Sequence, residues 1–383
     1  MTYKRLGDYI REVNVRNRDE MVTKLVGLTI DKAFIPSVAN VIGTDLSNYK
    51  IISSEQFACS LMQVSRDGKI PVAIFEDEKA IMSPAYPMFE VIDKTALLPQ
   101  YLMMWFSRSE FDREASYYAV GGVRGSLTWE DFCNMQLPIP SIERQREIVE
   151  EYETLSRRIS MNEQMIQKLE ATAQALYRKM FVENIDKENL PDGWRMGSFT
   201  EVIDICGGGT PSTEEIEYWK EGKIPFYSPG DKTTFYYSLK TEKRITEKGL
   251  AHCSSKLYPK NTTFVTARGA TTGGLTLSGC PMAMNQTCYA FVDKEKQNPF
   301  YVHQLALDTM ASLKNEAVGA TFEALVTKDF ENTGIIIVPK ELRNAFNREA
   351  TIIYNIILLK QQENLKLAEL QSLLLAKMGN LKQ

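Results

Sequence analysis

The chain has 383 residues, of which 44% are hydrophobic and 25% are charged, and its formal net charge is −4. This length predicts two or three domains, and this composition is typical of a soluble globular protein. No apolar run reaches membrane length and the first residues lack the apolar core of a signal peptide, so we expect a cytoplasmic protein without membrane spans.

Residues 1–140 predict a first globular domain made of short strands and few helices. A helix is predicted over 97–114, and a glycine turn that carries Arg124 follows it. The predicted strands, which are rich in β-branched residues and bounded by turns, are 25–35, 49–52, 59–65, 70–75 and 89–92.

A long helix is predicted over 141–183, because this stretch contains neither proline nor glycine. Its apolar residues recur at alternating steps of four and three, which is the seam of a coiled coil. Asn162 is the polar exception, and it either fixes the register of a helix pair or is tolerated by a partly wet seam. The predicted seam residues are Ile148, Tyr152, Leu155, Ile159, Asn162, Ile166, Leu169 and Leu176.

A second globule is predicted over 190–339, with strands and helices in the same order as the first. A second long helix is predicted over 340–383, where the only glycine is Gly379. Its apolar stripe is broader and less regular than that of the first helix. We assign Ile356, Leu359, Leu370 and Leu374 to its seam.

The two halves of the chain contain an internal repeat. Residues 119–132 align with residues 317–330 at an offset of 198, with six identities. A nearby offset aligns Arg66 with Arg268 and predicts that they occupy equivalent places. The repeat favours a duplicated α+β unit whose two long helices pair as an antiparallel coiled coil with pseudo-twofold symmetry, and the alternative is two unrelated domains.

Charge is distributed unevenly within the second globule. Between Lys220 and Arg268 there are ten lysines and arginines and four acidic residues, with aromatic residues between them. Basic side chains neutralise phosphates and planar rings contact bases, so this stretch is a candidate nucleic-acid surface. A solvated basic surface over core aromatics explains the composition equally well.

Motifs for catalysis are weak. No Gly-Lys-Ser/Thr follows Gly207–Gly209, so this loop does not match a phosphate-binding loop. The six cysteines form no CxxC pair and only two histidines are present, which argues against structural zinc and for reduced thiols. Asp67, Asp77 and Lys79 could form the carboxylate–lysine set of a metal-dependent nuclease, although Asp67 also fits a simple turn. We therefore expect a non-catalytic chain that binds no metal and no cofactor itself.

Several segments together resemble the specificity subunit of type I restriction–modification systems along nearly the whole chain. The second helix entry departs from the family pattern, because the segment from Pro339 to Arg343 lacks the glutamine that would match Gln145. The segments that carry the resemblance are 27–37 (GLTIDKAFIPS), 66–68 (RDG), 135–149 (MQLPIPSIERQREIV), 190–194 (LPDGW), 208–212 (GGTPS), 227–231 (YSPGD), 268–270 (RGA) and 285–286 (NQ).

The resemblance implies two target recognition domains, at 1–140 and 190–339, that each read one half of a split sequence in double-stranded DNA. The helices 141–183 and 340–383 would act as a ruler for the gap between the half-sites. Two methyltransferase subunits, which bind S-adenosylmethionine and methylate adenine, would dock on this subunit, and motor-nuclease subunits would join them for restriction.

Candidate DNA-contacting residues are basic or hydroxyl side chains in predicted loops, for which the alternative is an ordinary surface charge. A metal-dependent nuclease and a coiled-coil scaffold without a DNA role remain the rival functions. The candidates are Arg16, Arg18, Arg66, Lys69 and Arg124 in the first globule and Thr210, Lys232, Lys243, Arg244, Arg268 and Thr271 in the second.

Overall fold

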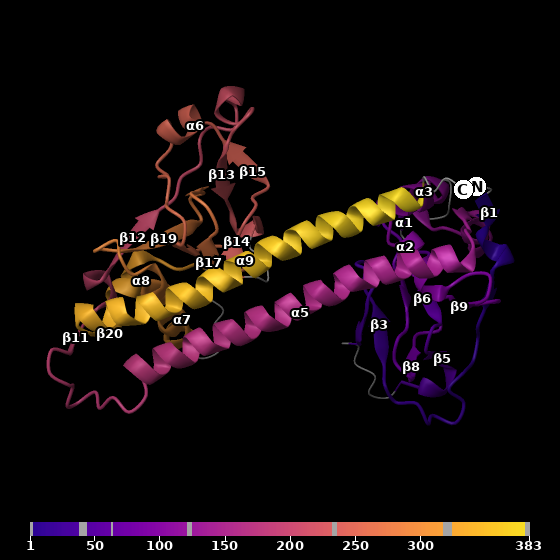
Figure 1. Cartoon of the computed structure of the whole chain (residues 1–383), viewed down its shortest axis with the longest axis horizontal. Helices are drawn as coiled ribbons and strands as arrows, with labels where there is room; N and C mark the ends of the chain where they lie inside the picture. The colour runs from indigo at the N-terminus through magenta and orange to yellow at the C-terminus, as the bar shows by residue number, and fades with distance from the viewer. Residues whose placement is uncertain are drawn as a thin grey trace. The chain divides into compact units, whose positions relative to one another are not determined.

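The computed structural model of the chain describes residues 3–37, 44–62, 64–120, 125–231, 236–316 and 324–379. Contacts between residues divide the chain into two units. Unit 1 comprises Met1–Ile159 and Lys366–Gln383, and unit 2 comprises Ser160–Leu365. Each unit contains one globule and a part of each of two long helices (Figure 1). Among the described helices, none combines the length and the apolar character of a membrane span.

The globule of unit 1 consists of short strands and short helices. Its elements are β1 (Tyr3–Arg5), η1 (Leu6–Asp8), β2 (Ile10–Glu12), β3 (Val26–Leu28), β4 (Phe34–Pro36), η2 (Leu46–Asn48), β5 (Lys50–Ser53), β6 (Phe57–Cys59), α1 (Val64–Asp67), β7 (Val72–Ile74), β8 (Lys79–Met82), β9 (Met88–Val91), α2 (Pro99–Phe106), α3 (Ser109–Ala119), α4 (Trp129–Asn134) and β10 (Gln136–Pro138).

An antiparallel sheet with the strand order β2-β9-β6-β7 forms the centre of this globule. Phe57 on β6 lies opposite Phe89 on β9, and their rings stack with centroids 5.0 Å apart. Phe106 at the end of α2 packs edge-on against both rings, so α2 covers this face of the sheet. Aromatic side chains favour such half-buried strands because they pack well against cross-strand neighbours. Two-stranded sheets join β1 to β10, β3 to β4 and β5 to β8.

The globule of unit 2 follows a similar element order. Its elements are β11 (Arg195–Ser198), η4 (Phe199–Glu201), β12 (Ile203–Gly207), η5 (Ile216–Tyr218), β13 (Ile224–Tyr227), η6 (Pro229–Asp231), β14 (Tyr237–Ser238), β15 (Lys243–Ile245), α6 (Glu247–Ala251), β16 (Thr263–Thr266), β17 (Leu275–Ser278), β18 (Ala283–Met284), β19 (Cys288–Asp293), α7 (Pro299–Glu316), α8 (Thr327–Glu331) and β20 (Gly334–Ile337).

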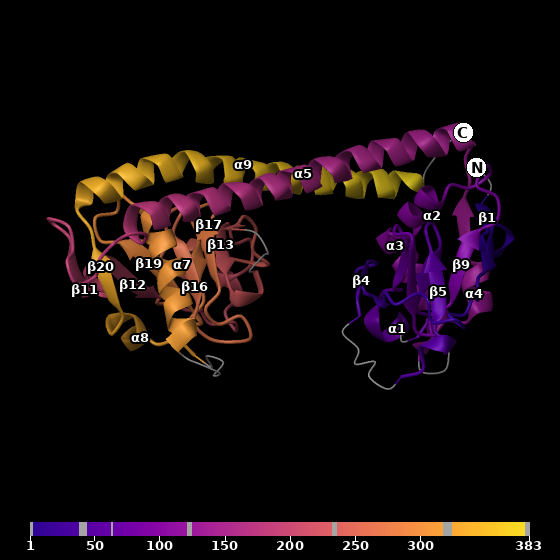
Figure 2. The ribbon, with the colours of Figure 1, turned by 90° about the horizontal axis from the view of Figure 1, so that it is seen from below.

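A sheet with the strand order β12-β19-β16-β17-β14 forms the centre of unit 2, and α7 lies against it (Figure 2). The rings of Phe199, Phe291 and Phe330 pack together under this sheet, with centroids 5.0–5.6 Å apart. A smaller sheet, β15-β13-β18, extends together with α6 away from the main sheet and forms an arm (Figure 1). The final two-stranded sheet pairs β11 with β20.

Matching hydrogen bonds show how the two globules correspond. Leu127 N donates to Leu61 O in unit 1, and Leu325 N donates to Ala267 O in unit 2, each at 2.8 Å. Arg268 therefore corresponds to the residue after Leu61, which is Met62, and the predicted equivalence of Arg66 with Arg268 is wrong by four residues. The physical reason is the helix α1, which follows this turn in unit 1 and carries Arg66, whereas unit 2 forms only turns there.

The two predicted long helices are present as α5 (Ile142–Phe181) and α9 (Lys340–Met378). In unit 2, Asn162 Nδ2 donates to Asn364 Oδ1 at 2.8 Å, and Tyr354 OH donates to Glu170 Oε1 at 3.3 Å. Residue numbers therefore fall along α9 as they rise along α5. The predicted antiparallel pairing is confirmed, and Asn162 is a hydrogen-bonded seam residue with a matched amide partner.

The same pairing continues in unit 1. Gln371 Nε2 donates to Ser156 Oγ at 2.7 Å, and Met378 lies in the core that contains Ile148. The predicted α5 seam residues are buried or half-buried in both units, which agrees with their steps of four and three.

The predicted seam of α9 needs correction. Ile356, Leu359 and Leu370 are 36%, 62% and 49% exposed, and only Leu374 of that set is half-buried. The buried face of α9 also follows steps of three and four, but polar side chains hide the repeat because amides occupy several of its positions. The buried residues of this face include Phe346, Ala350, Tyr354, Ile357, Gln361, Asn364 and Met378.

Side-chain amides anchor the start of each long helix on its globule. Gln145 is fully buried, its Oε1 accepts from Leu98 N at 2.8 Å, and its Nε2 donates to Ala96 O and Pro140 O. In unit 2 Asn347, one turn beyond Arg343, accepts from the N–H of the residue after Pro299 at 3.0 Å. The departure from the family pattern at Arg343 therefore leaves the anchoring function in place.

The end of α9 closes against the start of the chain within unit 1. Tyr3 OH donates to Gly379 O at 3.0 Å, and the Tyr3 ring packs edge-on against Trp105 at 6.1 Å. The guanidinium of Arg108 stacks on the Trp105 ring, 4.1 Å from the ring centroid. Only 7% of the Arg108 side chain is exposed, so a cation fills the space beside the end of α9.

Candidate nucleic-acid interface

Arg16 and Arg18 come together around the short helix η2 of unit 1. Arg16 Nη1 donates to the carbonyl oxygen of Asn48 at 2.6 Å, and Arg18 Nη1 donates to its Oδ1 at 3.3 Å. Lys50 lies beside them with its Nζ bonded to Tyr86 O at 2.9 Å, and burial lowers its pKa. The structure thus places two guanidinium groups around Asn48, with a buried ammonium nearby, which is a local concentration of positive charge.

Arg66 and Lys69 are both held by carboxylates of unit 1. Arg66 Nε and Nη2 donate to Asp67 at 2.7 and 3.2 Å, and Lys69 Nζ lies 3.1 Å from Asp31. These exposed pairs contribute little to stability, and the basic groups can exchange their partners for a phosphate. Arg124, the other candidate of this globule, lies outside the described residues, as does Lys232 in unit 2.

An exposed aromatic pair lies next to α1 and was not predicted from the sequence. Tyr117 and Tyr118 at the end of α3 are 77% and 45% exposed, and their rings meet edge-on at 5.9 Å. Ser116 Oγ donates to Val64 O, so this end of α3 lies beside the helix that carries Arg66. The sequence does contain a signal for this pair, because the two adjacent tyrosines fall outside the apolar stripe of the helix.

The glycine loop of unit 2 is explained by close backbone packing. A Cβ at Gly208 would lie 1.9 Å from the carbonyl oxygen of Asn285, and one at Gly209 would lie 2.1 Å from Ser254 Oγ. Only glycine therefore fits at these positions. Thr210 follows them, is exposed and donates to Gln286 Oε1, so the loop presents a hydroxyl and an amide together.

Lys243 and Arg244 line a groove in the arm of unit 2, together with Lys220, Ile216 and Trp219. Lys243 Nζ lies 5.9 Å from the centroid of the Trp219 ring. Trp219 Nε1 donates to Ser212 O at 2.9 Å and thereby joins the arm to the loop that contains Thr210. An aromatic face surrounded by cations suits a nucleotide better than it suits an apolar peptide.

Arg268 and Thr271 lie together on an exposed turn of unit 2. Gly269 in this turn has φ = 108°, and Thr272 Oγ1 donates to its carbonyl oxygen at 2.6 Å. Lys314 of α7 packs beside Gly273 at the base of the turn. This turn corresponds to the one that follows β6 in unit 1, where Met62 is 61% exposed.

The proposed nuclease residues do not form a metal site. Asp67 is bound to Arg66, and Asp77 Oδ2 lies 2.5 Å from Lys24 Nζ, so each carboxylate already has a different cation. No group of three or more histidine, cysteine, aspartate or glutamate side chains suited to a metal ion occurs in the part of the chain that the structure describes.

Comparison with a protein-family model identifies both halves of the chain. The model of the type I restriction modification DNA specificity domain matches residues 39–171 and 191–367. The type I restriction enzyme HindI specificity subunit of Haemophilus influenzae is 23% identical over 366 residues, which cover 76% of this chain and 79% of that protein. The MjaIX specificity subunit of Methanocaldococcus jannaschii is 32% identical over 144 residues, and the match spans about a third of its length, 33%.

A solved structure shares the fold. The type I restriction–modification S subunit from M. genitalium aligns over 98% of this chain and 95% of its own, with a TM-score of 0.59 and 14% sequence identity.

Proposed function

The chain belongs to the family of type I restriction–modification DNA specificity domains, and from this premise we propose how it reads DNA. It is a non-catalytic DNA-specificity subunit and not a nuclease, as the sequence predicted. We propose that each globule reads one half of a bipartite target and that the antiparallel helices α5 and α9 hold the two readers at a set spacing. The observation that carries this proposal is the repeated plan, in which Leu127 of unit 1 and Leu325 of unit 2 form matching backbone hydrogen bonds to the segments that follow β6 and β16.

We further propose that two methyltransferase subunits bind this chain and supply S-adenosylmethionine chemistry on adenine, and that motor-nuclease subunits join the complex for restriction. This chain then needs no cofactor, and it acts in the cytoplasm, where the target DNA lies. A net charge of −4 fits this division of labour, because partner subunits can neutralise phosphates while this chain contacts bases.

Exchanging residues 1–140 for the equivalent globule of another specificity subunit is expected to change one half of the methylated sequence. The other half and the gap should persist, because unit 2 and both helices are retained. Long-read mapping of methylated adenines in cells that carry either chain measures this. An unchanged pattern would instead favour the coiled-coil scaffold without a DNA role.

Replacing both Arg16 and Arg18 by alanine is expected to weaken binding of the assembled enzyme to its target by about tenfold or more. Each lost phosphate contact also lowers the salt dependence of binding, by about one in the log–log slope, whereas a lost base contact changes sequence preference. Fluorescence anisotropy at several salt concentrations separates these effects. Arg11→Ala is the matched control, because Arg11 is an exposed arginine already paired with Glu90; an equal loss in this control would contradict the assignment.

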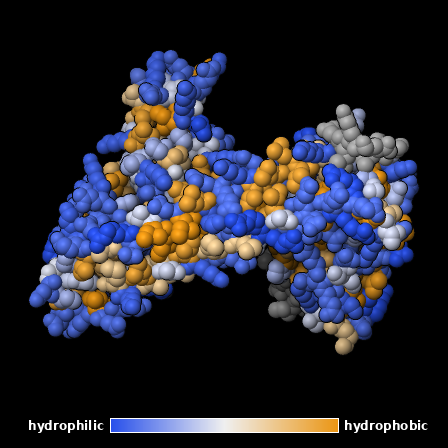
Figure 3. Space-filling model, viewed as in Figure 1, coloured by the Kyte–Doolittle hydropathy of each residue, from blue (hydrophilic) through white to orange (hydrophobic). Residues whose placement is uncertain are grey.

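Apolar residues on the outward face of α9 are the proposed docking sites for the methyltransferase subunits (Figure 3). In unit 2, Ile352 and Leu359 are 61% and 62% exposed. In unit 1, Leu370 and Leu373 line a groove of about 560 Å³ that also includes Leu155. Exposed apolar residues gathered along one helix mark an interaction surface, and one such surface in each unit suits two partner subunits.

Replacing Ile352 and Leu359 together by glutamate is expected to reduce recovery of the methyltransferase subunits with the purified chain by about tenfold, since charge is depleted at the centre of interfaces. The melting temperature of the free chain should change little, because both side chains are already exposed. Gln362→Glu, an exposed position of the same helix, is the control for added charge. Unchanged recovery of the double variant would place the docking site elsewhere.

A further inference from the structure

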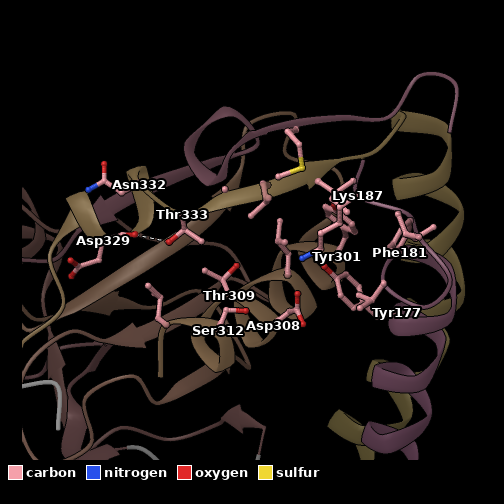
Figure 4. A pocket seen from close by; sticks show the side chains of 18 residues that line it. Tyr177, Phe181, Lys187, Tyr301, Asp308, Thr309, Ser312, Asp329, Asn332 and Thr333 are labelled. Carbon is pink, nitrogen blue, oxygen red and sulfur yellow. Dashed lines mark hydrogen bonds between the residues drawn. The ribbon is translucent and has the colours of Figure 1, made fainter. Parts of the chain in front are cut away.

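A cavity of about 560 Å³ lies in unit 2, beside the end of α5, the connector that follows it, α7 and the segment from α8 to β20 (Figure 4). The rings of Tyr177 and Tyr301 form its floor, with centroids 6.0 Å apart. These residues are 4% and 1% exposed, yet neither hydroxyl forms a hydrogen bond with any residue that the structure describes. Both hydroxyls line the cavity and are not among the buried polar atoms that lack a partner, so they can bond to a polar group that enters it.

The rim of the cavity carries charged side chains of both signs. Asp308 on α7 and Lys187 on the connector both line it, and among the described residues neither takes part in an ion pair. Burial raises the pKa of Asp308, while the positive charges of Lys187 and Arg178 lower it. Asp308 is therefore an exposed carboxylate at the mouth of a cavity that has hydroxyl groups at its base.

Unit 1 shows what occupies the corresponding space in the repeat. Tyr101 and Tyr301 each stand two residues after the proline that begins α2 or α7, and Tyr101 OH is bonded to Pro138 O at 3.0 Å. Counting onward from these tyrosines, Arg108 corresponds to Asp308. The break between α2 and α3 lets Arg108 turn toward the end of α9, where its guanidinium stacks on Trp105 and fills the space.

Unit 2 thus has a carboxylate and an open cavity where unit 1 supplies its own guanidinium. We propose that the cavity of unit 2 receives the guanidinium of an arginine side chain from another protein subunit, with Asp308 as its counter-ion and the hydroxyls of Tyr177 and Tyr301 as hydrogen-bond acceptors. Guanidinium matches this lining because it offers five N–H donors in a plane and is more weakly hydrated than ammonium. That the arginine comes from another subunit rests on the proposed function of the chain as a subunit. That the site binds a guanidinium does not depend on the proposed function.

The first test titrates Nα-acetylarginine amide into the full chain and follows binding by calorimetry, with Nα-acetylnorleucine amide as the uncharged control ligand. Wild-type chain is expected to bind the arginine probe, and Asp308→Asn is expected to weaken that binding by about tenfold, which is about 1.4 kcal/mol. Asp204→Asn, an exposed aspartate on β12, is the matched control. Equal binding of both probes, or no effect of Asp308→Asn, overturns the site.

The second test builds the arrangement of unit 1 into unit 2 with Leu305→Trp and Asp308→Arg together. This variant should fill its own cavity, melt at a higher temperature than wild type and lose the arginine probe. A folded variant that still binds the probe as wild type does overturns the proposal. If the variant does not fold, the comparison of Asp308→Asn with Asp204→Asn decides alone.

The third test distinguishes the sources of the guanidinium in the chain assembled with its methyltransferase subunits. Assembly is expected to slow hydrogen exchange over 301–313 and to block the probe. If the assembled complex binds the probe as tightly as the free chain, the partner source is overturned and a free small cation is the ligand. These results stand apart from the methylation pattern of the globule exchange, so failure of one proposal can be told from failure of the other.

Discussion

Glu170→Gln is expected to stabilise unit 2 at pH 8 by about 1–3 kcal/mol and to flatten its dependence on pH. Glu170 is 1% exposed, one carboxylate oxygen accepts from Tyr354, and the other has no hydrogen-bond partner among the described residues. Burial raises its pKa from the ordinary 4.5 to about 7, although hydrogen bonds from Tyr354 and Gln174 lower it. The wild-type chain therefore keeps a costly buried charge at pH 8, and glutamine removes that charge.

The sign of the pH effect follows from the raised pKa. The folded state binds the proton of Glu170 more tightly than the unfolded state, so the contribution of Glu170 to stability is greatest below about pH 4.5 and is lost as the pH rises to about 7. His303, the nearby imidazole, has its pKa lowered to about 3 by burial and stays neutral throughout this window. The buried phenols of Tyr237 and Tyr354 have raised pKa values and remain protonated as well.

The measurement is the melting temperature of unit 2 between pH 4.5 and pH 8, with hydrogen exchange over α7 to identify the unit. Each 1 kcal/mol corresponds to about 2–4 °C for a unit of this size. Glu163→Gln, on the same helix, is the control for a glutamate in a less buried position. A Glu170→Gln chain that melts with the same pH dependence as wild type would contradict the argument.

Asp112→Ala is expected to destabilise unit 1 by about 3–5 kcal/mol, the largest loss we anticipate from a single substitution. Asp112 Oδ1 lies 2.8 Å from Lys32 Nζ and accepts from Ile70 N at 3.2 Å. The two charged side chains are only 10% and 12% exposed, and Lys32 Nζ also donates to Phe106 O. Removing the carboxylate would leave a buried ammonium without its counter-ion.

The double variant Lys32→Met with Asp112→Leu should lose less stability than Asp112→Ala, because no uncompensated charge remains. Asp31→Ala, which breaks the exposed pair with Lys69, should cost less than about 1 kcal/mol. Denaturant unfolding measures these changes, and hydrogen exchange should show β3 and β4 opening first, because Lys32 lies in the turn between them. Equal losses for Asp112→Ala and Asp31→Ala would show that the buried pair is not important for stability.

The first long helix was predictable and the face of the second was not, for a physical reason. Along α5 nearly all seam positions hold apolar residues, so the 4-3 repeat can be recognised in the sequence. Along α9 several seam positions are amides, such as Gln361, which accepts from Tyr237 N at 3.1 Å, and Asn364. Seam positions that hold hydrogen-bonding amides do not contribute to a hydrophobic periodicity. The sequence prediction therefore assigned the more apolar outward face of α9 to the seam.

The sequence predicted which residue types form the candidate interface, but not which of these residues lie together. Sequence reasoning selected Arg16 and Arg18 as loop cations, yet only the fold shows that Asn48 brings them together. The sequence prediction also made Arg66 equivalent to Arg268, because an alignment at a fixed offset cannot account for the additional helix α1 in unit 1. The assignment of individual DNA contacts therefore stays a prediction, and the variants described above are its test.

The hydrogen bond from Tyr3 to Gly379 makes unit 1 nearly a closed loop, because the start of β1 lies against the end of α9. Unit 2 reaches the same closure through a covalent connector, 182–194. A circularly permuted gene, joined through a short linker near residues 379 and 3 and opened within 182–194, would therefore encode the same strand pairings and helix contacts. Tolerance of such a rearrangement would mean that the order in which the two half-site readers are translated is incidental to how they fold.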